Sequence, residues 1–211
     1  MKDRGRFLLR LGLVAGCFSA AAGSPSAFAG AVRTITLAQG SCNNLPAIPV
    51  VFDIPADYVT RAPASGKPSV GCFWGTPSDL DRAMKDPKGI DFSSIQNGIF
   101  WARPAADLHF DRGRNQFLDG RGADEAAMKA RFEKTGAKNA VVRRGAVGAY
   151  ATLQFTGDLP AGPNHKAGRL ARIYIATGNG GNTCLVEYHR PAHPTPTDDS
   201  VWQQFVSSLR S

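Results

Sequence analysis

Cys72 is the residue of this chain whose type and surroundings most directly suggest chemistry. It lies in the stretch Gly71-Cys72-Phe73-Trp74-Gly75, where two glycines flank a cysteine and two aromatic residues. A cysteine thiolate can act as a nucleophile, and a cysteine in an oxidising compartment can instead form a disulfide. The two chemistries exclude each other, because a disulfide removes the thiol that a nucleophile needs.

The pentapeptide resembles the segment around the nucleophilic cysteine of the peptide methionine-sulfoxide reductase A family. That resemblance implies a thiolate that attacks a sulfoxide while a carboxylate protonates the sulfoxide oxygen. The family has a glutamate five residues after the cysteine, where this chain has Pro77, and its downstream Gly-His-Ala-Glu block is absent here. A motif without its context supports an activity only weakly. We therefore interpret residues 70–75 as a strand and predict no catalytic residue.

Cys184, His189 and His193 form a second set, with the spacing C-x4-H-x3-H and residue types that bind zinc. Cys184 and His189 are an odd number of positions apart, so they point to opposite faces of a regular strand. Pro191 and Pro194 place His193 in an extended tail. We therefore predict no metal site and no cofactor.

The first 29 residues have the organisation of an export signal. A basic start precedes the apolar run 11–23, and residues 27–29 (Ala-Phe-Ala) have the small-x-small pattern of a cleavage site. We predict cleavage after Ala29, which leaves one periplasmic or secreted domain over 30–211. Alternatively, the segment Val-Ala-Gly-Cys that ends at Cys17 resembles a bacterial lipobox, in which Cys17 becomes a lipid anchor.

Export delivers the chain to an oxidising compartment, where cysteines tend to pair. Removal or lipidation of Cys17 leaves Cys42, Cys72 and Cys184, which can form one bridge in three ways. We predict a Cys42–Cys72 disulfide, because we expect the strand of Cys72 to run antiparallel beside the strand near residue 50. Cys184, in a late hairpin, is then a buried free thiol.

The chain has 211 residues and a formal net charge of +8, which is unevenly distributed. Residues 129–172 carry nine Lys and Arg against two Asp and Glu. Such a basic segment can bind an anionic lipid, an envelope polymer or an acidic protein, or can simply keep the protein soluble. The predicted binding residues are those on strands that we expect to be neighbours: Arg143, Arg144, Arg169 and Arg172.

Apolar periodicity predicts many short strands and three helices, and the last helix has one apolar stripe that we expect to be buried: Trp202, Phe205, Val206 and Leu209. Residues 111–122 are polar and rich in glycine, which predicts a loop. We expect an α+β fold: a single domain with a mainly antiparallel sheet and packed helices. The expected helices are 78–86, 124–135 and 198–209, and the expected strands are 32–38, 48–58, 70–75, 97–105, 139–144, 147–156, 169–177 and 183–189.

This layout resembles that of PsbP-like proteins, which are small exported α/β/α-sandwich domains. The segment FDIPADY (52–58) is similar to their early strand-Pro-aromatic segment. Residues 171–188 are similar to their late hairpin, and residues 198–209 to their closing helix. The resemblance spans most of the mature chain and carries over no site residue. It implies a non-catalytic binding or accessory role.

The sequence therefore predicts an exported, non-catalytic binding or accessory protein whose partner is an envelope protein or an anionic lipid or polymer. Export separates the chain from nucleic acid, which we exclude as a partner. No apolar run reaches the roughly 18 residues of a membrane span. The alternative is a small exported redox or hydrolytic enzyme, which a cleft lined by convergent His, Asp or Cys would favour.

Overall fold

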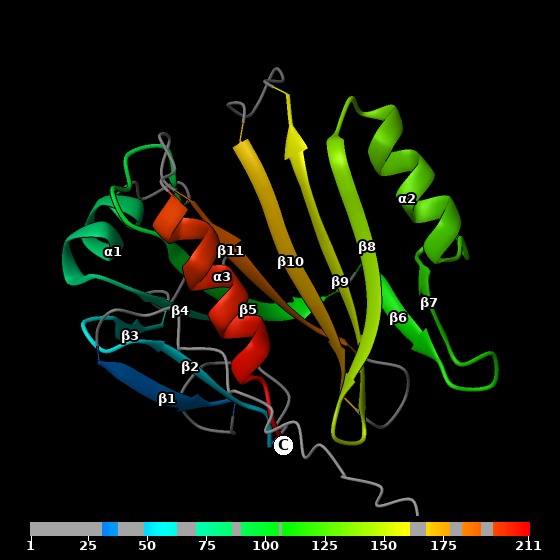
Figure 1. The fold of residues 1–211 in the computed structure, drawn as a ribbon, viewed down its shortest axis with the longest axis horizontal. Coiled ribbons are helices and arrows are strands. Elements are labelled where there is room, and N and C mark those ends of the chain that lie inside the picture. Colours follow the sequence, from blue (N-terminus) through cyan, green and yellow to red (C-terminus); the bar gives the residue numbers. More distant parts are fainter. Residues whose placement is uncertain are drawn as a thin grey trace, which may run out of the picture.

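The computed structural model of this chain describes residues 31–37, 49–62, 71–85, 90–105, 107–160, 168–177, 183–190 and 196–211. Within them the chain has the predicted α+β fold, with one large antiparallel sheet and packed helices (Figure 1). The signal segment 1–29 lies outside the described residues, so cleavage after Ala29 and lipidation of Cys17 stay predictions. No helix in the described part of the chain is long and apolar enough to cross a lipid bilayer.

The large sheet contains seven strands, and every neighbouring pair is antiparallel. In spatial order they are β3 (Val59–Arg61), β4 (Cys72–Gly75), β5 (Ile99–Ala105), β11 (Thr183–His189), β10 (Gly168–Ala176), β9 (Tyr150–Leu159) and β8 (Lys138–Val147). The predicted late hairpin is confirmed as the β10–β11 pair. Pairing of β5 with β11 joins the meander β8–β11 to the earlier strands.

The strand that carries Cys72 has different neighbours from those expected. We expected β4 beside the strand near residue 50, but β4 pairs with β3 and β5. Strand β2 (Val51–Pro55) pairs instead with β1 (Val32–Thr36) in a separate two-stranded sheet. Phe52 of β2 meets Trp74 of β4 edge to face, with ring centroids 5.4 Å apart. The two strands therefore touch across layers of the core instead of sharing a sheet.

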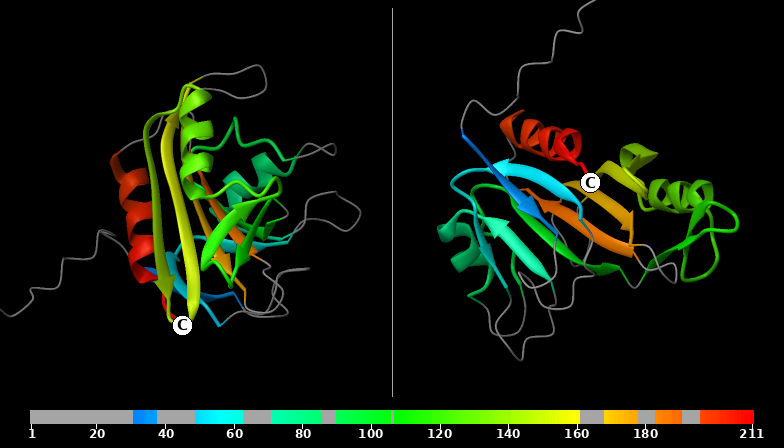
Figure 2. Two further views of the ribbon diagram at one scale, coloured as in Figure 1. Left: turned by 90° about the vertical axis from the view of Figure 1, so that its right-hand side faces the viewer. Right: turned by 90° about the horizontal axis from the view of Figure 1, so that it is seen from below.

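Helix α3 (Pro196–Ser208) and the β1–β2 pair cover one face of the large sheet (Figure 2). The predicted apolar stripe of this helix is confirmed, because Trp202 and Phe205 are buried in the main core. Val206 and Leu209 are partly buried and pack against the same core. The stripe fixes the C-terminal end of the chain across the sheet.

Two separate groups of elements cover the opposite face (Figure 2). Helix α1 (Pro77–Ala83) packs over β4 and β5, and helix α2 (Glu125–Lys134) packs beside β8. Next to α2 lies a short hairpin of β6 (Leu108–Asp111) and β7 (Gln116–Asp119). The expected loop over 111–122 is therefore wrong in its second half. Phe117 is fully buried against the sheet, which explains why β7 forms there.

The start of α1 differs from the prediction and ties the helix to a distant loop. Thr76, two residues before the expected start, is the N-cap residue, and its hydroxyl oxygen accepts the N–H of Asp79. The fully buried Asp79 carboxylate also accepts the backbone N–H groups of Gln96 and Asn97, each at 2.8 Å. Burial alone raises the pKa of Asp79, but these hydrogen bonds outweigh it and hold the pKa below its ordinary value.

Candidate ligand-binding site

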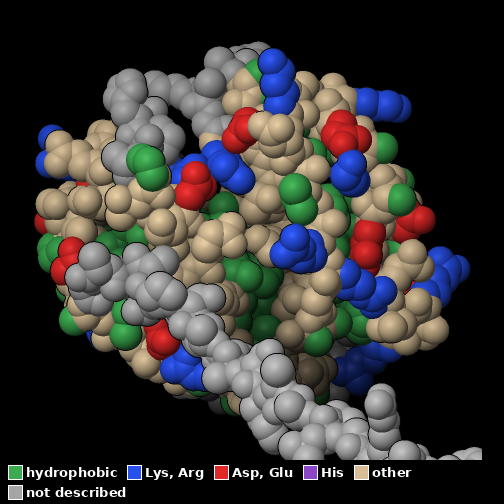
Figure 3. All heavy atoms as spheres, in the orientation of Figure 1, with side chains coloured by type: hydrophobic (Ala, Val, Ile, Leu, Met, Phe, Trp, Pro, Cys, Tyr) green, Lys and Arg blue, Asp and Glu red, His purple; other side chains and the backbone are tan. Residues whose placement is uncertain are grey.

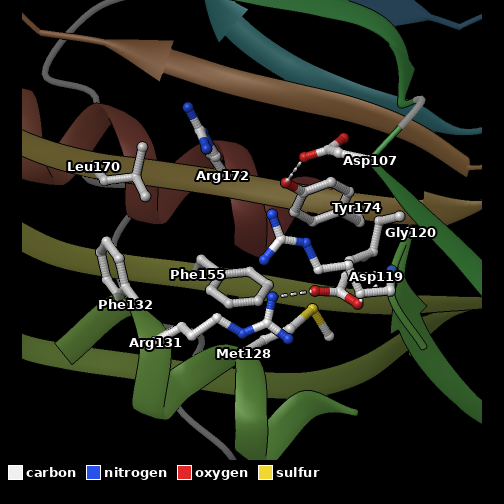
Figure 4. A pocket seen from close by; sticks show the side chains of 12 residues that line it. Asp107, Asp119, Gly120, Met128, Arg131, Phe132, Phe155, Leu170, Arg172 and Tyr174 are labelled. Carbon is white, nitrogen blue, oxygen red and sulfur yellow. Dashed lines mark hydrogen bonds and ion pairs between the residues drawn. The ribbon is translucent and has the colours of Figure 1, made fainter. Parts of the chain in front are cut away.

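A pocket of about 570 Å³ lies on the sheet face opposite α3 (Figure 4). Strands β9 and β10 form its floor, α2 forms one wall, and the segments around β6 and β7 form the other. The floor residues are Phe155, Leu170, Arg172 and Tyr174; the α2 residues are Met128, Arg131 and Phe132; the second wall consists of Asp107, Leu108, Asp119, Gly120 and Arg121.

Strand alternation explains the composition of the floor. On β10, Leu170, Arg172 and Tyr174 are two positions apart, so their side chains share one face of the sheet. On β9, Phe155 lies directly opposite Arg172 in the antiparallel register. The rings of Phe155 and Tyr174 meet edge to face with centroids 5.8 Å apart. The floor is therefore apolar and aromatic, with one guanidinium among the rings.

Asp119 joins the second wall of the pocket to α2. Its carboxylate accepts the backbone N–H groups of Arg121 at 2.9 Å and Ala123 at 2.8 Å. Arg131 of α2 binds the other carboxylate oxygen at 2.5 Å (Figure 4). The hydrogen bond from Ala123, with those from Arg121 and Arg131, lowers the pKa of Asp119. Asp119 and Arg131 are therefore an ionised pair that fixes the distance between the two walls.

Tyr174 provides the hydroxyl group of the floor. It donates a hydrogen bond to Asp107 Oδ2 at 3.1 Å (Figure 4). Burial raises the pKa of Tyr174 well above its ordinary value, and the nearby Asp107 raises it further. The phenol is therefore neutral at physiological pH and serves as a hydrogen-bond donor.

Arg172 also contacts a buried carboxylate beside the pocket. The Glu187 side chain is 4% exposed, and its Oε1 atom forms an ion pair with Arg172 Nε. Its Oε2 atom accepts a hydrogen bond of 3.2 Å from Arg103 Nε. Burial alone raises the pKa of Glu187, but the two guanidinium groups outweigh it and hold the pKa below its ordinary value. We call Arg103, Glu187 and Arg172 the arginine clamp.

The four predicted binding residues do not form one surface. Arg144 and Arg172 lie on the sheet face that carries the pocket. Because side chains alternate along a strand, Arg143 and Arg169 lie on the opposite face, which α3 covers. The strands that carry them, β8 and β10, are separated by β9 and are not the neighbours we expected. Of the four, only Arg172 lines the pocket.

Most of these arginines also have acidic or polar partners. Arg169 lies 3.4 Å from Asp199 of α3, and Arg144 donates to Asn115 Oδ1 at 2.9 Å. Lys and Arg side chains alternate with Asp and Glu across the face shown in Figure 3. This arrangement differs from a continuous basic patch, because interspersed acidic groups reduce the local potential.

Cys72 and Cys184 differ in chemical state. Cys72 is fully buried and disulfide-bonded, whereas Cys184 is a buried free thiol. Burial raises the pKa of Cys184 to about 12, so it carries no thiolate at physiological pH. Cys42 lies outside the described residues, so the Cys42–Cys72 pairing stays a prediction.

Packing accounts for the glycine before Cys72. Gly71 has φ +114, and a Cβ on it would lie 1.9 Å from the carbonyl oxygen of Ala102. Phe73 and Trp74 then point to opposite faces of β4, into two different core clusters. The pentapeptide that resembles a reductase motif is therefore explained by strand pairing and core packing.

The possible zinc ligands point apart. Cys184 belongs to the core under α3, and His189 stacks on Phe92 with ring centroids 3.6 Å apart. His193 lies outside the described residues. Within the described part of the chain, no group of three or more His, Cys, Asp and Glu side chains could hold a metal ion. Burial lowers the pKa of His189 to about 4, so its imidazole is neutral at neutral pH.

Sequence reasoning missed most of the pocket, because its residues come from segments far apart in the chain. Phe155 and Tyr174 appear in the sequence as ordinary strand residues, and Met128 and Phe132 as a helix face. The one available signal was Arg172, a charged residue between Ala171 and Ile173, both of which are buried. A charge at a core-facing position indicates a partner or a ligand.

No protein-family model matches this chain, and no curated protein matches it. Among solved structures, the chain is similar to the Ran-binding protein Mog1p of Saccharomyces cerevisiae, with 10% sequence identity and a TM-score of 0.41. The match covers 86% of this chain and 95% of that chain. A match at this level assigns no function to the chain.

Proposed function

We propose that this chain is an exported, non-catalytic binding protein that holds a small amphipathic anion in the pocket between α2, β9 and β10. The proposal rests on one observation: a cavity of about 570 Å³ combines an apolar floor with arginine side chains. Ligand sites of roughly 300–1,000 Å³ typically combine apolar walls with a few polar groups that orient the ligand.

The protonation states of the pocket support binding instead of proton transfer. The pKa of Asp119 is lowered and the pKa of Tyr174 is raised, so neither group titrates near neutral pH. General acids and bases work best when their pKa lies near the working pH. Asp119 therefore stays ionised and Tyr174 stays a neutral hydrogen-bond donor, as groups that orient a ligand do.

The sequence supports the cellular setting of this proposal. The signal-like segment 1–29 favours the periplasm or the extracellular space, and the PsbP-like pattern favours an accessory role. From the sequence we predicted an envelope protein, an anionic lipid or an anionic polymer as the partner. A cavity of this size favours a small molecule or a single lipid chain over a polymer or a protein surface.

Isothermal titration calorimetry of the purified chain with dodecanoate tests the proposal. We expect saturable one-to-one binding that dodecylamine, with the opposite charge, does not show. Met128→Trp, which fills the pocket from α2, should abolish binding. Ala130→Trp is the matched control on the same helix, because Ala130 is exposed and does not line the pocket.

Two results would contradict the proposal. The first is failure of dodecanoate and of other long-chain carboxylates to bind at millimolar concentration. The second is equal binding by Met128→Trp and by Ala130→Trp, which would place the ligand elsewhere on the protein.

A further inference from the structure

We propose that the arginine clamp binds the carboxylate head group of the ligand, with Glu187 as the residue that positions both guanidinium groups. This inference rests on the proposed function, because Arg172 belongs to both the clamp and the pocket. It adds the chemical class of the head group and a residue, Arg103, that does not line the pocket.

In the clamp, the Nε atom of each guanidinium contacts Glu187, and the terminal nitrogens are left for a ligand. Arg103 and Arg172 each contact Glu187 through Nε, one on each carboxylate oxygen. Within the described part of the chain, the terminal nitrogens of these two arginines make no hydrogen bond or ion pair. The terminal nitrogens are the atoms with which arginine binds carboxylates in pairs.

Both guanidinium groups are held in place and are still accessible. The side chains of Arg103 and Arg172 are 25% and 34% exposed, whereas Glu187 is 4% exposed. Arg103 Cζ also lies 5.0 Å from the centroid of the Trp101 ring, a cation–π contact that restricts its rotation. A ligand therefore meets two oriented donors and loses little entropy in ordering them.

The charge of the clamp favours a monoanion. Two arginines and one ionised carboxylate leave a net charge of +1. His189, two positions beyond Glu187 on β11, is neutral at neutral pH and adds no charge. One carboxylate would neutralise the clamp, whereas a dianionic phosphate would leave an excess negative charge beside Glu187.

The register of the sheet connects the clamp to the apolar floor. Phe155, Arg172, Glu187 and Trp101 form one row of direct cross-strand partners over β9, β10, β11 and β5. A carboxylate bound to Arg172 would therefore lie one strand from the ring of Phe155. The apolar chain of the same ligand can lie over Phe155 and along α2.

Arginine side-chain NMR of ¹⁵N-labelled protein tests the clamp without the apolar part of the ligand. Titration with acetate should shift the guanidinium signals of Arg103 and Arg172. Arg143, which has no ion pair within the described residues and lies on the other sheet face, is the internal control. Unchanged Arg103 and Arg172 signals, or equal shifts at Arg143, would overturn the inference even if dodecanoate binds in the pocket.

Variants of Arg103 test the clamp with the complete ligand. Arg103→Gln should weaken dodecanoate binding about tenfold, since charge-assisted hydrogen bonds are lost. It should leave the affinity for dodecanol, which has no charge, unchanged. Arg103→Lys should recover only part of the affinity, because lysine lacks the planar fork. Arg143→Gln is the matched control and should bind as the natural protein does.

These experiments separate the two proposals. If dodecanoate binds, Met128→Trp blocks it and Arg103→Gln does not weaken it, the pocket is correct and the clamp is wrong. If acetate shifts the clamp signals and dodecanoate binds no more tightly than acetate, the clamp is correct and the amphipathic pocket is wrong. If inorganic phosphate binds more tightly than acetate, the assignment of a carboxylate is wrong.

Discussion

The ring of Phe132 on α2 occupies the space above Gly157 on β9. A Cβ on Gly157 would lie 2.7 Å from Phe132 Cε1 and 3.0 Å from its Cζ, closer than ordinary carbon contacts. The absence of a side chain at Gly157 therefore lets α2 approach the floor of the pocket. Phe132 also meets Phe155 edge to face, with ring centroids 6.5 Å apart.

Gly157→Ala should displace α2 and disturb the pocket. We expect a loss of about 1–2 kcal/mol in the free energy of unfolding, because the added methyl group overpacks the contact. Gly113→Ala is the control, since its Cβ would meet only Asp111 Oδ1 at 3.4 Å. Urea denaturation measures both. If Gly157→Ala costs as much in a Phe132→Ala background as in the natural chain, the steric explanation is wrong.

Replacing Glu187 should change the dependence of stability on pH. Because the pKa of Glu187 is lowered in the folded state, its ionised form stabilises the fold above the ordinary value of 4.5. This contribution is lost as pH falls through the folded-state pKa. Glu187→Gln should therefore flatten the curve of unfolding free energy below the ordinary pKa of 4.5.

At neutral pH the same variant should be less stable by about 2 kcal/mol, since two partly buried arginines lose their counter-ion. Glu133→Gln removes an exposed carboxylate of α2 and is the control. Thermal unfolding measured from pH 3 to pH 7 gives both quantities. Parallel curves for Glu187→Gln and the natural chain would exclude an ionised Glu187 that stabilises the fold.

Asp79 should be more important for stability than its position on a seven-residue helix suggests. Asp79→Ala leaves the N–H groups of Gln96 and Asn97 without their acceptor and should cost about 3 kcal/mol. Asp81→Ala on the same helix removes an exposed ion pair and should cost under about 1 kcal/mol. Equal losses in denaturant titrations would contradict the role of the buried carboxylate.

Trp202→Ala should destabilise the chain by about 3–5 kcal/mol, because the indole is 3% exposed in the core under α3. Gln203, the next residue on the helix, is exposed, and Gln203→Ala is the control. Differential scanning calorimetry measures the change. A melting temperature within a degree or so of the natural value would show that α3 does not hold the fold together.

The predicted Cys42–Cys72 disulfide can be mapped chemically. Alkylation of the unreduced, denatured protein should label Cys184 and leave Cys72 unlabelled, because Cys72 is disulfide-bonded. Mass spectrometry of proteolytic fragments should then recover a linked pair that contains Cys42 and Cys72. Recovery of Cys72 linked to Cys17 would show that the pairing is wrong.

The elements with strong local signals were predictable from the sequence. The stripe of Trp202 and Phe205 predicted the buried face of α3, and the expected helix 124–135 begins at Asp124, which is the N-cap of α2. The turn-rich segment after β10 and the alternation on both sides predicted the β10–β11 hairpin. In each case the residues that determine the structure lie within about one helix turn or one hairpin of each other.

Features that depend on distant residues were not predictable. Strand β7 is only four residues long inside a polar segment, and Phe117 is buried by strands that follow it in the chain. The order of strands around β4 depends on β5 and not on sequence proximity to β2. The clamp and the pocket depend in turn on that order, since Arg103 and Arg172 are brought together only through β11.

The pairing of β5 with β11 has a consequence for how the chain folds. The meander β8–β11 is built from neighbouring hairpins, whereas the Arg103–Glu187 contact joins residues 84 positions apart. Long loops must close before such contacts form, so pairs of this kind form late. We expect the clamp to be assembled in the last stage of folding. A carboxylate that bridges both arginines would then connect β5 to the meander β8–β11. Such a ligand would lower the unfolding rate of the chain and so increase its kinetic stability.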